Sequence, residues 1–98
     1  MRVYFTHAAD ASLERIGDFI AEDNPARAAS FVAELRDKAL SLSELPRGFP
    51  LVPRYEQRGI RRRSHRGYGI LYSLEAEGIV IHRFIGPRQD YDRILGLE

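Results

Sequence analysis

The chain has 98 residues, of which 44% are hydrophobic and 30% are charged, and its formal net charge is +1. This length fits one domain, residues 1–98, and so ordinary a hydrophobic share excludes disorder throughout the chain. There is no cysteine, which excludes disulfides and thiolate metal sites, and there is neither a signal-peptide core nor an apolar run of about 20 residues. We therefore expect a cytoplasmic protein that makes no contact with a membrane.

Residues 2–5 form a short run of β-prone side chains, and we expect a first strand there. The run ends at Thr6, whose hydroxyl can accept a hydrogen bond from a free backbone N–H at the start of a helix. Apolar residues then recur at helical spacing, with acidic residues between them. This pattern predicts an amphipathic helix that ends near Ala21.

A second helix is predicted from Pro25, because Asn24 can cap it and proline at the first helical position loses no hydrogen bond. Its apolar stripe keeps helical spacing as far as Leu45, where Pro46 and Gly48 end it. Only a few residues separate the two helices, so we expect an antiparallel helical hairpin.

Residues 46–53 hold three prolines and a glycine, which exclude a regular helix or a central strand and predict a surface loop. Residues 59–64 then resemble a strand in spite of their arginines. In this strand Ile60 and the alkyl stems of Arg61 or Arg63 can cover apolar surface while the guanidinium groups stay in water.

Two dense β patterns follow, at residues 68–74 and 79–85, with a turn of hairpin composition at residues 75–78. The first pattern alternates strictly and predicts a strand with one well-buried face. The second is apolar on both faces, so we place it centrally in the sheet. By alternation its faces are Ile79, Ile81 and Ile85 on one side, and Val80 and Phe84 on the other. Residues 90–97 are expected to form a short C-terminal helix or a mobile end.

The predicted order is β-α-α-β-β-β. A helical hairpin that packs on one face of a mostly antiparallel sheet gives a two-layer α+β domain. The other face of the sheet is left free for a partner.

Residues 58–66 carry the strongest charge signal, because this stretch holds five arginines and no acidic residue. Arginine binds phosphate or carboxylate in fork geometry, and strands are a rigid mount for it. The alternative is a solvated edge strand whose charges resist aggregation. The first interpretation predicts a surface that binds an anionic partner, and as exposed side chains Arg61, Arg62 and Arg63 should be replaceable by alanine without loss of folding.

The histidines, His7, His65 and His82, are spread over separate elements without carboxylate partners at ligand spacing, so we expect neither a metal site nor a cofactor. Ser64 and His65 are adjacent in sequence, but neighbouring side chains of a strand point to opposite faces and cannot form a catalytic dyad. Arginine is always protonated and is a poor general base.

These motifs together resemble the RelE/ParE superfamily of bacterial toxins. The resemblance covers nearly the whole chain and is carried by Ala9 to Ile16, Asn24-Pro25 to Ala28, Leu45-Pro46 to Gly48, Ile60-Arg61, Tyr68 to Tyr72, and Ile81 to Asp90. It implies the toxin of a type II toxin-antitoxin system. It also implies a cognate antitoxin, ParD-like or similar, whose disordered end folds onto the helical hairpin and the sheet to form a hetero-oligomer.

RelE-like members of the superfamily are ribosome-dependent mRNA endonucleases, and this chain departs from their pattern. Where those members have two lysines, this chain has Ile60 and Arg62. Where they have a central arginine, this chain has Gly69. If the chain were RelE-like, the resemblance would assign the catalytic residues Arg62, Arg88 and Tyr91. The missing lysine and central arginine argue against mRNA cleavage.

ParE-like members inhibit DNA gyrase, and they often end in a run like Arg88-Gln89-Asp90. The resemblance therefore favours a non-enzymatic gyrase inhibitor, with the ribosomal endonuclease as an alternative. A further alternative is an inactive toxin-derived module that only pairs with an antitoxin. The expected target-binding residues are Arg61, Arg62, Arg63, Arg66, Arg83, Arg88 and Gln89.

Overall fold

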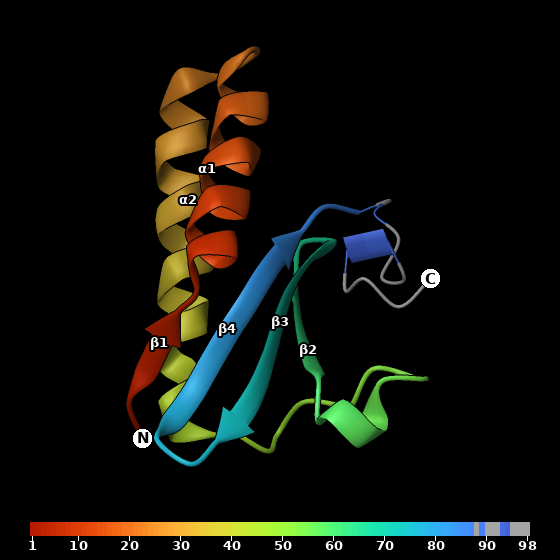
Figure 1. Ribbon diagram of the computed structural model, residues 1–98. Coiled ribbons are helices and arrows are strands. Elements are labelled where there is room, and N and C mark those ends of the chain that lie inside the picture. Colours follow the sequence, from red (N-terminus) through yellow and green to blue (C-terminus); the bar gives the residue numbers. More distant parts are fainter. Residues whose placement is uncertain (88, 90–92, 95–98) are drawn as a thin grey trace.

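The computed structural model describes residues 1–87, 89 and 93–94, and it confirms the predicted α+β fold and the order β-α-α-β-β-β (Figure 1). The elements are β1 (Val3–Phe5), α1 (His7–Ala21), α2 (Pro25–Leu40), the 3-10 helices η1 (Ser41–Glu44) and η2 (Glu56–Arg58), β2 (Arg61–His65), β3 (Tyr68–Glu75) and β4 (Gly78–Ile85). The expected C-terminal helix falls largely outside the described residues.

Both predicted helix caps are present. The Thr6 hydroxyl accepts a hydrogen bond from the backbone N–H of Ala9 at 3.0 Å, and the Asn24 side chain accepts one from the N–H of Arg27 at 3.1 Å. Each cap satisfies an N–H group that the first turn of a helix leaves without an intrahelical partner. The two helices lie side by side as the expected antiparallel hairpin (Figure 1).

The second helix ends earlier than its apolar stripe predicts. The α-helical part stops at Leu40, and the chain continues to Glu44 as a 3-10 turn. Leu45, which precedes Pro46, has a φ of −148° and a ψ of 62°, because a residue before proline is disfavoured in the α region. The last turn of the stripe therefore tightens, as helix ends commonly do.

The sheet has the order β1-β4-β3-β2, so the predicted central position of β4 is confirmed. β1 runs parallel to β4, and the other pairs are antiparallel. β1 covers β4 only from Ile79 to Ile81. Beyond this point α1 replaces the missing strand: the hydroxyl of Ser12 accepts a hydrogen bond from the N–H of Phe84 at 2.9 Å and donates one to the carbonyl of Ala9 at 2.8 Å.

A β-bulge in β4 changes which side chains face the helices. Leu71 pairs with Arg83 while its neighbour Tyr72 pairs with Ile81, so His82 is the extra residue. An extra residue reverses the alternation beyond it. The predicted grouping of β4 is therefore wrong for Phe84, which joins the core under the helices, and for Ile85, which faces the other way.

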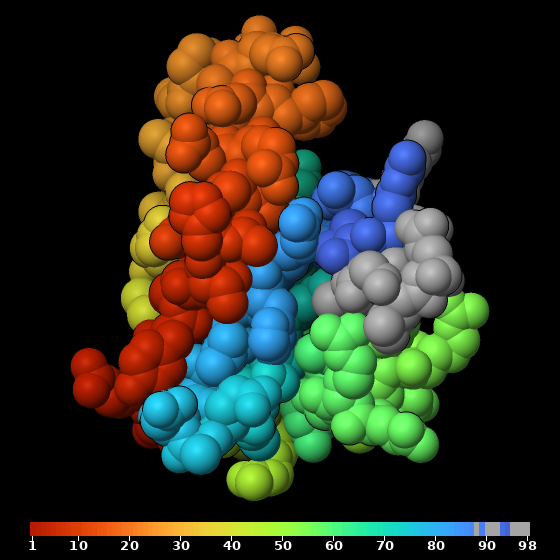
Figure 2. Space-filling view, viewed as in Figure 1, coloured from red at the N-terminus to blue at the C-terminus, as the bar shows by residue number. Residues whose placement is uncertain are grey.

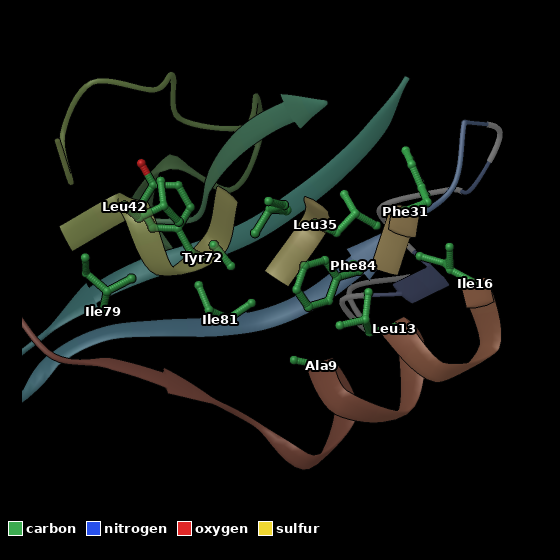
Figure 3. Packing of buried hydrophobic residues seen from close by; sticks show 12 residues of the cluster. Ala9, Leu13, Ile16, Phe31, Leu35, Leu42, Tyr72, Ile79, Ile81 and Phe84 are labelled. Carbon is green, nitrogen blue, oxygen red and sulfur yellow. The ribbon is translucent and has the colours of Figure 1, made fainter. Parts of the chain in front are cut away.

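The main core lies between the helical hairpin and the sheet (Figure 3). Its larger buried side chains come from both helices, η1, β3 and β4, and include Leu13, Phe31, Leu35, Leu42, Ile70, Tyr72, Ile79, Ile81 and Phe84. The Tyr72 hydroxyl lies at the edge of this core and donates a hydrogen bond to the carbonyl of Pro46 at 2.8 Å. This bond ties the loop after η1 to the sheet.

A second, smaller cluster covers the opposite face of the sheet. It contains Val52, Tyr55, Ile60, Leu71 and Ile85, each at most 3% exposed. The segment around η2 thus folds over β3 and β4 on the face that the helices leave open. The expectation that this whole face is free for a partner is wrong for the part that this cluster covers.

Candidate functional site

The arginine run does not form one surface, because strand alternation divides it between the two faces of the sheet. Arg61 lies opposite Tyr72 and Arg63 opposite Ile70, so both point to the face that carries the helices. Arg62 lies opposite Leu71 and points to the other face.

Arg61 and Arg63 bind the protein's own backbone. The guanidinium of Arg61 donates to the carbonyl of Phe49 at 2.7 Å. That of Arg63 donates to the carbonyl of Lys38 at 3.1 Å and to the hydroxyl of Ser41 at 2.9 Å, and it lies 4.7 Å from the centre of the Phe49 ring. Lys38 is in the last turn of α2, where free carbonyls and the helix dipole favour a cation. The two guanidiniums are therefore not simply in water, as the sequence suggested. Arg63 fastens the end of α2 to the sheet, and Arg61 fastens the loop at Phe49.

Arg62 lies across Gly69 on the face of the sheet opposite the helices, which is called the open face below although the second cluster covers part of it. Its Nε donates to the hydroxyl of Ser64 at 3.0 Å, and a terminal nitrogen lies 3.5 Å from the carbonyl of Gly67. A Cβ at Gly69 would stand 2.7 Å from the Cζ of Arg62, which is too close for any real side chain. Arg62 thus occupies the space that a residue with a side chain at position 69 would need.

Arg66 belongs to a charged cluster around Glu34 of α2. The Glu34 carboxylate receives the guanidinium of Arg27 at 2.6 Å, the Nε2 of His65 at 2.9 Å and the Nε of Arg66 at 3.5 Å. The hydrogen bond from Arg27, followed by that from His65, lowers the pKa of Glu34 to about 2. Arg66 itself sits in the tight β2–β3 turn with a φ of 51°, followed by Gly67 at 84°. The cluster links α2 to this turn.

His82 belongs to a second polar group, on the open face. Its Nε2 lies 2.7 Å from the hydroxyl of Ser73, which in turn donates to the carboxylate of Glu75. Because the serine proton is given to Glu75, His82 must donate its own Nε2–H to the serine oxygen. Burial lowers the pKa of His82, and the neighbouring Glu75 opposes that shift.

The direction of this hydrogen bond is the reverse of that in a catalytic Ser–His pair, in which the histidine accepts the serine proton. Ser73 is also only 1% exposed, so a substrate cannot reach it. His65 and His82 each have one carboxylate nearby, that of Glu34 and that of Glu75 respectively. No group of three such side chains among the described residues could hold a metal ion.

A groove of about 550 Å³ lies between α1 and the end of the sheet. Arg15, Ile16 and Phe19 line it from α1, Arg83 and Phe84 from β4, and Tyr68 from β3. Gln89 also reaches it, and the side chain of Gln89 accepts a hydrogen bond from the N–H of Gly86. Figure 2 shows the orange surface of α1 beside the blue surface at the end of β4.

The predicted site residues therefore fall into separate places. Arg83 and Gln89 meet in the groove, Arg66 lies at the β2–β3 turn, and Arg62 lies on the open face. Arg88 and Tyr91 lie outside the described residues.

Sequence reasoning missed Arg15 and Phe19. The signal was their spacing of four residues, which puts them on one side of α1 beside its buried stripe.

Residues 3–91 match the protein family described as "ParE toxin of type II toxin-antitoxin system, parDE". Among solved structures, the fold is similar to "Chromosomal ParDE TA system from P. aeruginosa", with a TM-score of 0.76, 20% identity, and 90% of this chain and 97% of that chain covered. It is also similar to the toxin-antitoxin complex RelBE2 from Mycobacterium tuberculosis, with a TM-score of 0.62, 26% identity, and 86% and 94% covered. No curated protein sequence matches the chain. In the part of the chain that the structure describes, no helix is both long and apolar enough to cross a membrane.

Proposed function

Because the chain belongs to the family of ParE toxins of type II toxin-antitoxin systems, we propose that it arrests growth by inhibiting DNA gyrase. The resemblance noted from the sequence, to the ParE/RelE toxins, is confirmed at the level of the family. The choice of gyrase rather than the ribosome is the step that the proposal adds.

The observation that carries this choice is the arrangement of Arg62 over Gly69. The resemblance places the central arginine of the mRNA endonucleases at position 69, and here the side chain is absent and its space is filled by Arg62. Cleavage by attack of a 2′-hydroxyl needs a general base and an acid. Among the described residues of this face, His82 is turned to Ser73 as a donor and the arginines stay protonated. Both points favour a binding function over RNA cleavage.

Assays on the purified chain with gyrase test the proposal. We expect it to inhibit supercoiling of relaxed plasmid and to accumulate cleaved DNA, while primer extension on message from arrested cells shows no new ends at ribosomal A-site codons. Normal supercoiling together with A-site cleavage would contradict it and support the ribosomal endonuclease. For that second candidate the relevant observation is that Arg62 keeps a positive charge on the open face, and its residues would be Arg62, Arg88 and Tyr91.

For target binding we propose the side chains that reach solvent outside the core, namely Arg62, Arg66, Arg83 and Gln89, together with Arg88. The side chain of Arg66 is 65% exposed, which suits a contact of this kind. Arg61 and Arg63 also belong to the expected set, and each donates a hydrogen bond to the protein's own backbone. Replacing Arg66 by alanine should weaken gyrase inhibition at unchanged thermal stability.

A cognate antitoxin, ParD-like or similar, is the proposed partner in the cytoplasm, where the two form a hetero-oligomer. The two solved structures named above are toxin-antitoxin systems, which supports this partner. Expression of the chain alone should stop growth, and co-expression with the product of an adjacent short reading frame should restore it. Harmless accumulation of the chain alone would instead favour an inactive module that only pairs with an antitoxin.

A further inference from the structure

Three groups that can carry positive charge meet at one carboxylate, where α2 passes the β2–β3 turn. The Glu34 carboxylate lies 2.6 Å from the guanidinium of Arg27, 2.9 Å from Nε2 of His65 and 3.5 Å from Nε of Arg66. Within the described residues no other carboxylate forms an ion pair with any of these groups. His65 is charged only when protonated, but the two arginines already exceed the single negative charge of Glu34. The cluster therefore keeps a surplus of positive charge.

Two of the donors are held in place by contacts that do not involve Glu34. The guanidinium of Arg27 lies 5.0 Å from the centre of the Phe31 ring and donates to the hydroxyl of Ser30 at 3.1 Å. The ring of His65 stacks on Phe31 with centroids 5.8 Å apart, and Phe31 is only 4% exposed. A buried aromatic ring thus fixes both donors. They would keep their positions if the carboxylate moved away.

Glu34 is the member of the cluster that can leave. Its side chain is 34% exposed, and within the described residues its carboxylate contacts only these three donors. The side chain of Arg66 is 65% exposed and can follow a new ligand. The hydrogen bonds from Arg27 and His65 lower the pKa of Glu34 to about 2, so the position favours a negative charge. Rotation of Glu34 towards solvent would leave three donors directed at one point.

We propose that this cluster is a binding site for a phosphate group with two negative charges, and that Glu34 occupies the site in the free protein. A phosphate monoester carries about −1.5 to −2 elementary charges at pH 7 and offers three strong acceptor oxygens, which matches two arginines and a histidine. A phosphodiester carries one charge and balances the surplus less well. The site goes beyond the proposed function, since it requires neither gyrase nor an antitoxin.

The competing interpretation is that the cluster only fastens α2 to the β2–β3 turn. The two interpretations differ in what they predict for Glu34→Gln, which removes the charge and keeps the size of the side chain. A purely structural contact predicts a less stable chain without affinity for phosphate. An occupied binding site predicts that phosphate binds more tightly once its internal competitor has gone.

Titration of the ¹⁵N-labelled full chain with inorganic phosphate, followed by NMR at constant ionic strength, tests the proposal. We expect shifts at the backbone amides of Glu34, His65 and Arg66. Glu34→Gln should bind at least about tenfold more tightly than the parent chain, because phosphate no longer has to replace charged hydrogen bonds. Glu77→Gln, in the exposed turn at the other end of β3, changes the net charge equally and should keep the parent affinity. Equal affinity of the two variants would overturn the proposal.

A further substitution assigns the gain to the cluster. Added to Glu34→Gln, Arg66→Gln should weaken phosphate binding by at least about tenfold. Arg47→Gln, at an exposed arginine in the loop after η1, should not. Thermal melts establish that each variant is folded. Where Glu34→Gln does not fold, the parent chain decides, and an absence of shifts at the cluster amides would refute the site.

Two thymidine hexanucleotides, one with a 5′-phosphate and one with a 5′-hydroxyl, identify the source of the phosphate group. We expect only the first to shift the cluster amides. Binding of inorganic phosphate alone would support the site with free phosphate as its ligand. Equal binding of both hexanucleotides, tighter than that of inorganic phosphate, would assign the cluster to the nucleic-acid backbone and overturn the proposal. None of these titrations contains gyrase, so their failure and the failure of gyrase inhibition are separate results.

Discussion

At the scale of single residues, an arginine contributes according to the face of the strand that it occupies. Arg63 and Arg62 are neighbours in sequence, yet the first donates to the carbonyl of Lys38 at the end of α2 and the second lies over Gly69. Charge density in the sequence does not distinguish these uses, because both arise from contacts with residues distant along the chain.

Replacing Arg63 by alanine should lower the free energy of unfolding by about 1.5 to 3 kcal/mol, the range for hydrogen bonds to charged groups. The variant leaves the Lys38 carbonyl and the Ser41 hydroxyl without this donor. Arg47→Ala is the control and should stay within about 0.5 kcal/mol. Urea denaturation provides both values. Equal stability of the two variants would mean that the arginine run is surface only, as the sequence suggested.

The bulge residue His82 should make stability depend on pH. Burial lowers its pKa from the ordinary value of 6.5, so the unfolded chain binds a proton more readily than the folded one. The free energy of unfolding should therefore be at its full value above pH 6.5 and fall as the pH drops below it. His82→Gln keeps a donor for Ser73 and should flatten this dependence, while His7→Gln, an exposed histidine, should not. Urea denaturation at several pH values between 5 and 8 measures it.

At the scale of elements, α1 accepts a backbone hydrogen bond from the edge of β4 at a point that β1 does not reach. The hydroxyl of Ser12, which is 4% exposed, receives the N–H of Phe84 where β1 has already ended. A buried N–H without an acceptor costs about 1 to 3 kcal/mol. The short first strand is therefore tolerated because a helix residue satisfies the edge of β4.

Ser12→Ala should thus destabilise the chain by about 1 to 3 kcal/mol and speed hydrogen exchange at the Phe84 amide. The exposed Ser30 lies on the other helix, and Ser30→Ala is the matched control. Exchange at Phe84 that is as slow in the variant as in the parent chain would show that another group accepts this hydrogen bond.

Local signals predicted these elements well and their long-range contacts poorly. Thr6, Asn24 and Pro25 act within one helical turn, so sequence alone located both helix starts. The bulge at His82 depends on how β3 and β4 pair. No residue type near it predicts that the side chains of β4 change faces beyond this point. The groove was also missed, because Arg15 and Arg83 meet only after α1 has crossed β4.

At the scale of the whole molecule, the sheet is covered on both sides, by the helical hairpin and by the segment around η2. The second cover is small, but Leu71 and Ile85 beneath it are fully buried. The chain thus has two cores of unequal size that share one sheet.

Leu71→Ala should lower the free energy of unfolding by about 2 to 5 kcal/mol, as for a residue of a main core. Ile70→Ala, on the opposite face of the same strand, provides the comparison and should fall in the same range. Denaturant unfolding of the two variants measures this. A loss below about 0.5 kcal/mol for Leu71→Ala would mean that the second cluster adds nothing and the open face is bare after all.

The packing of Arg62 over Gly69 also limits how this chain could change by mutation. A side chain introduced at position 69 would meet the guanidinium of Arg62 at 2.7 Å and Ile85 at 3.0 Å. The guanidinium lies at the far end of a flexible side chain, so a new side chain at position 69 would displace it rather than be excluded. Arg62 would then lose its contacts with Ser64 and Gly67. A substitution at position 69 is therefore also a change at position 62, and its effect on function cannot be assigned to position 69 alone.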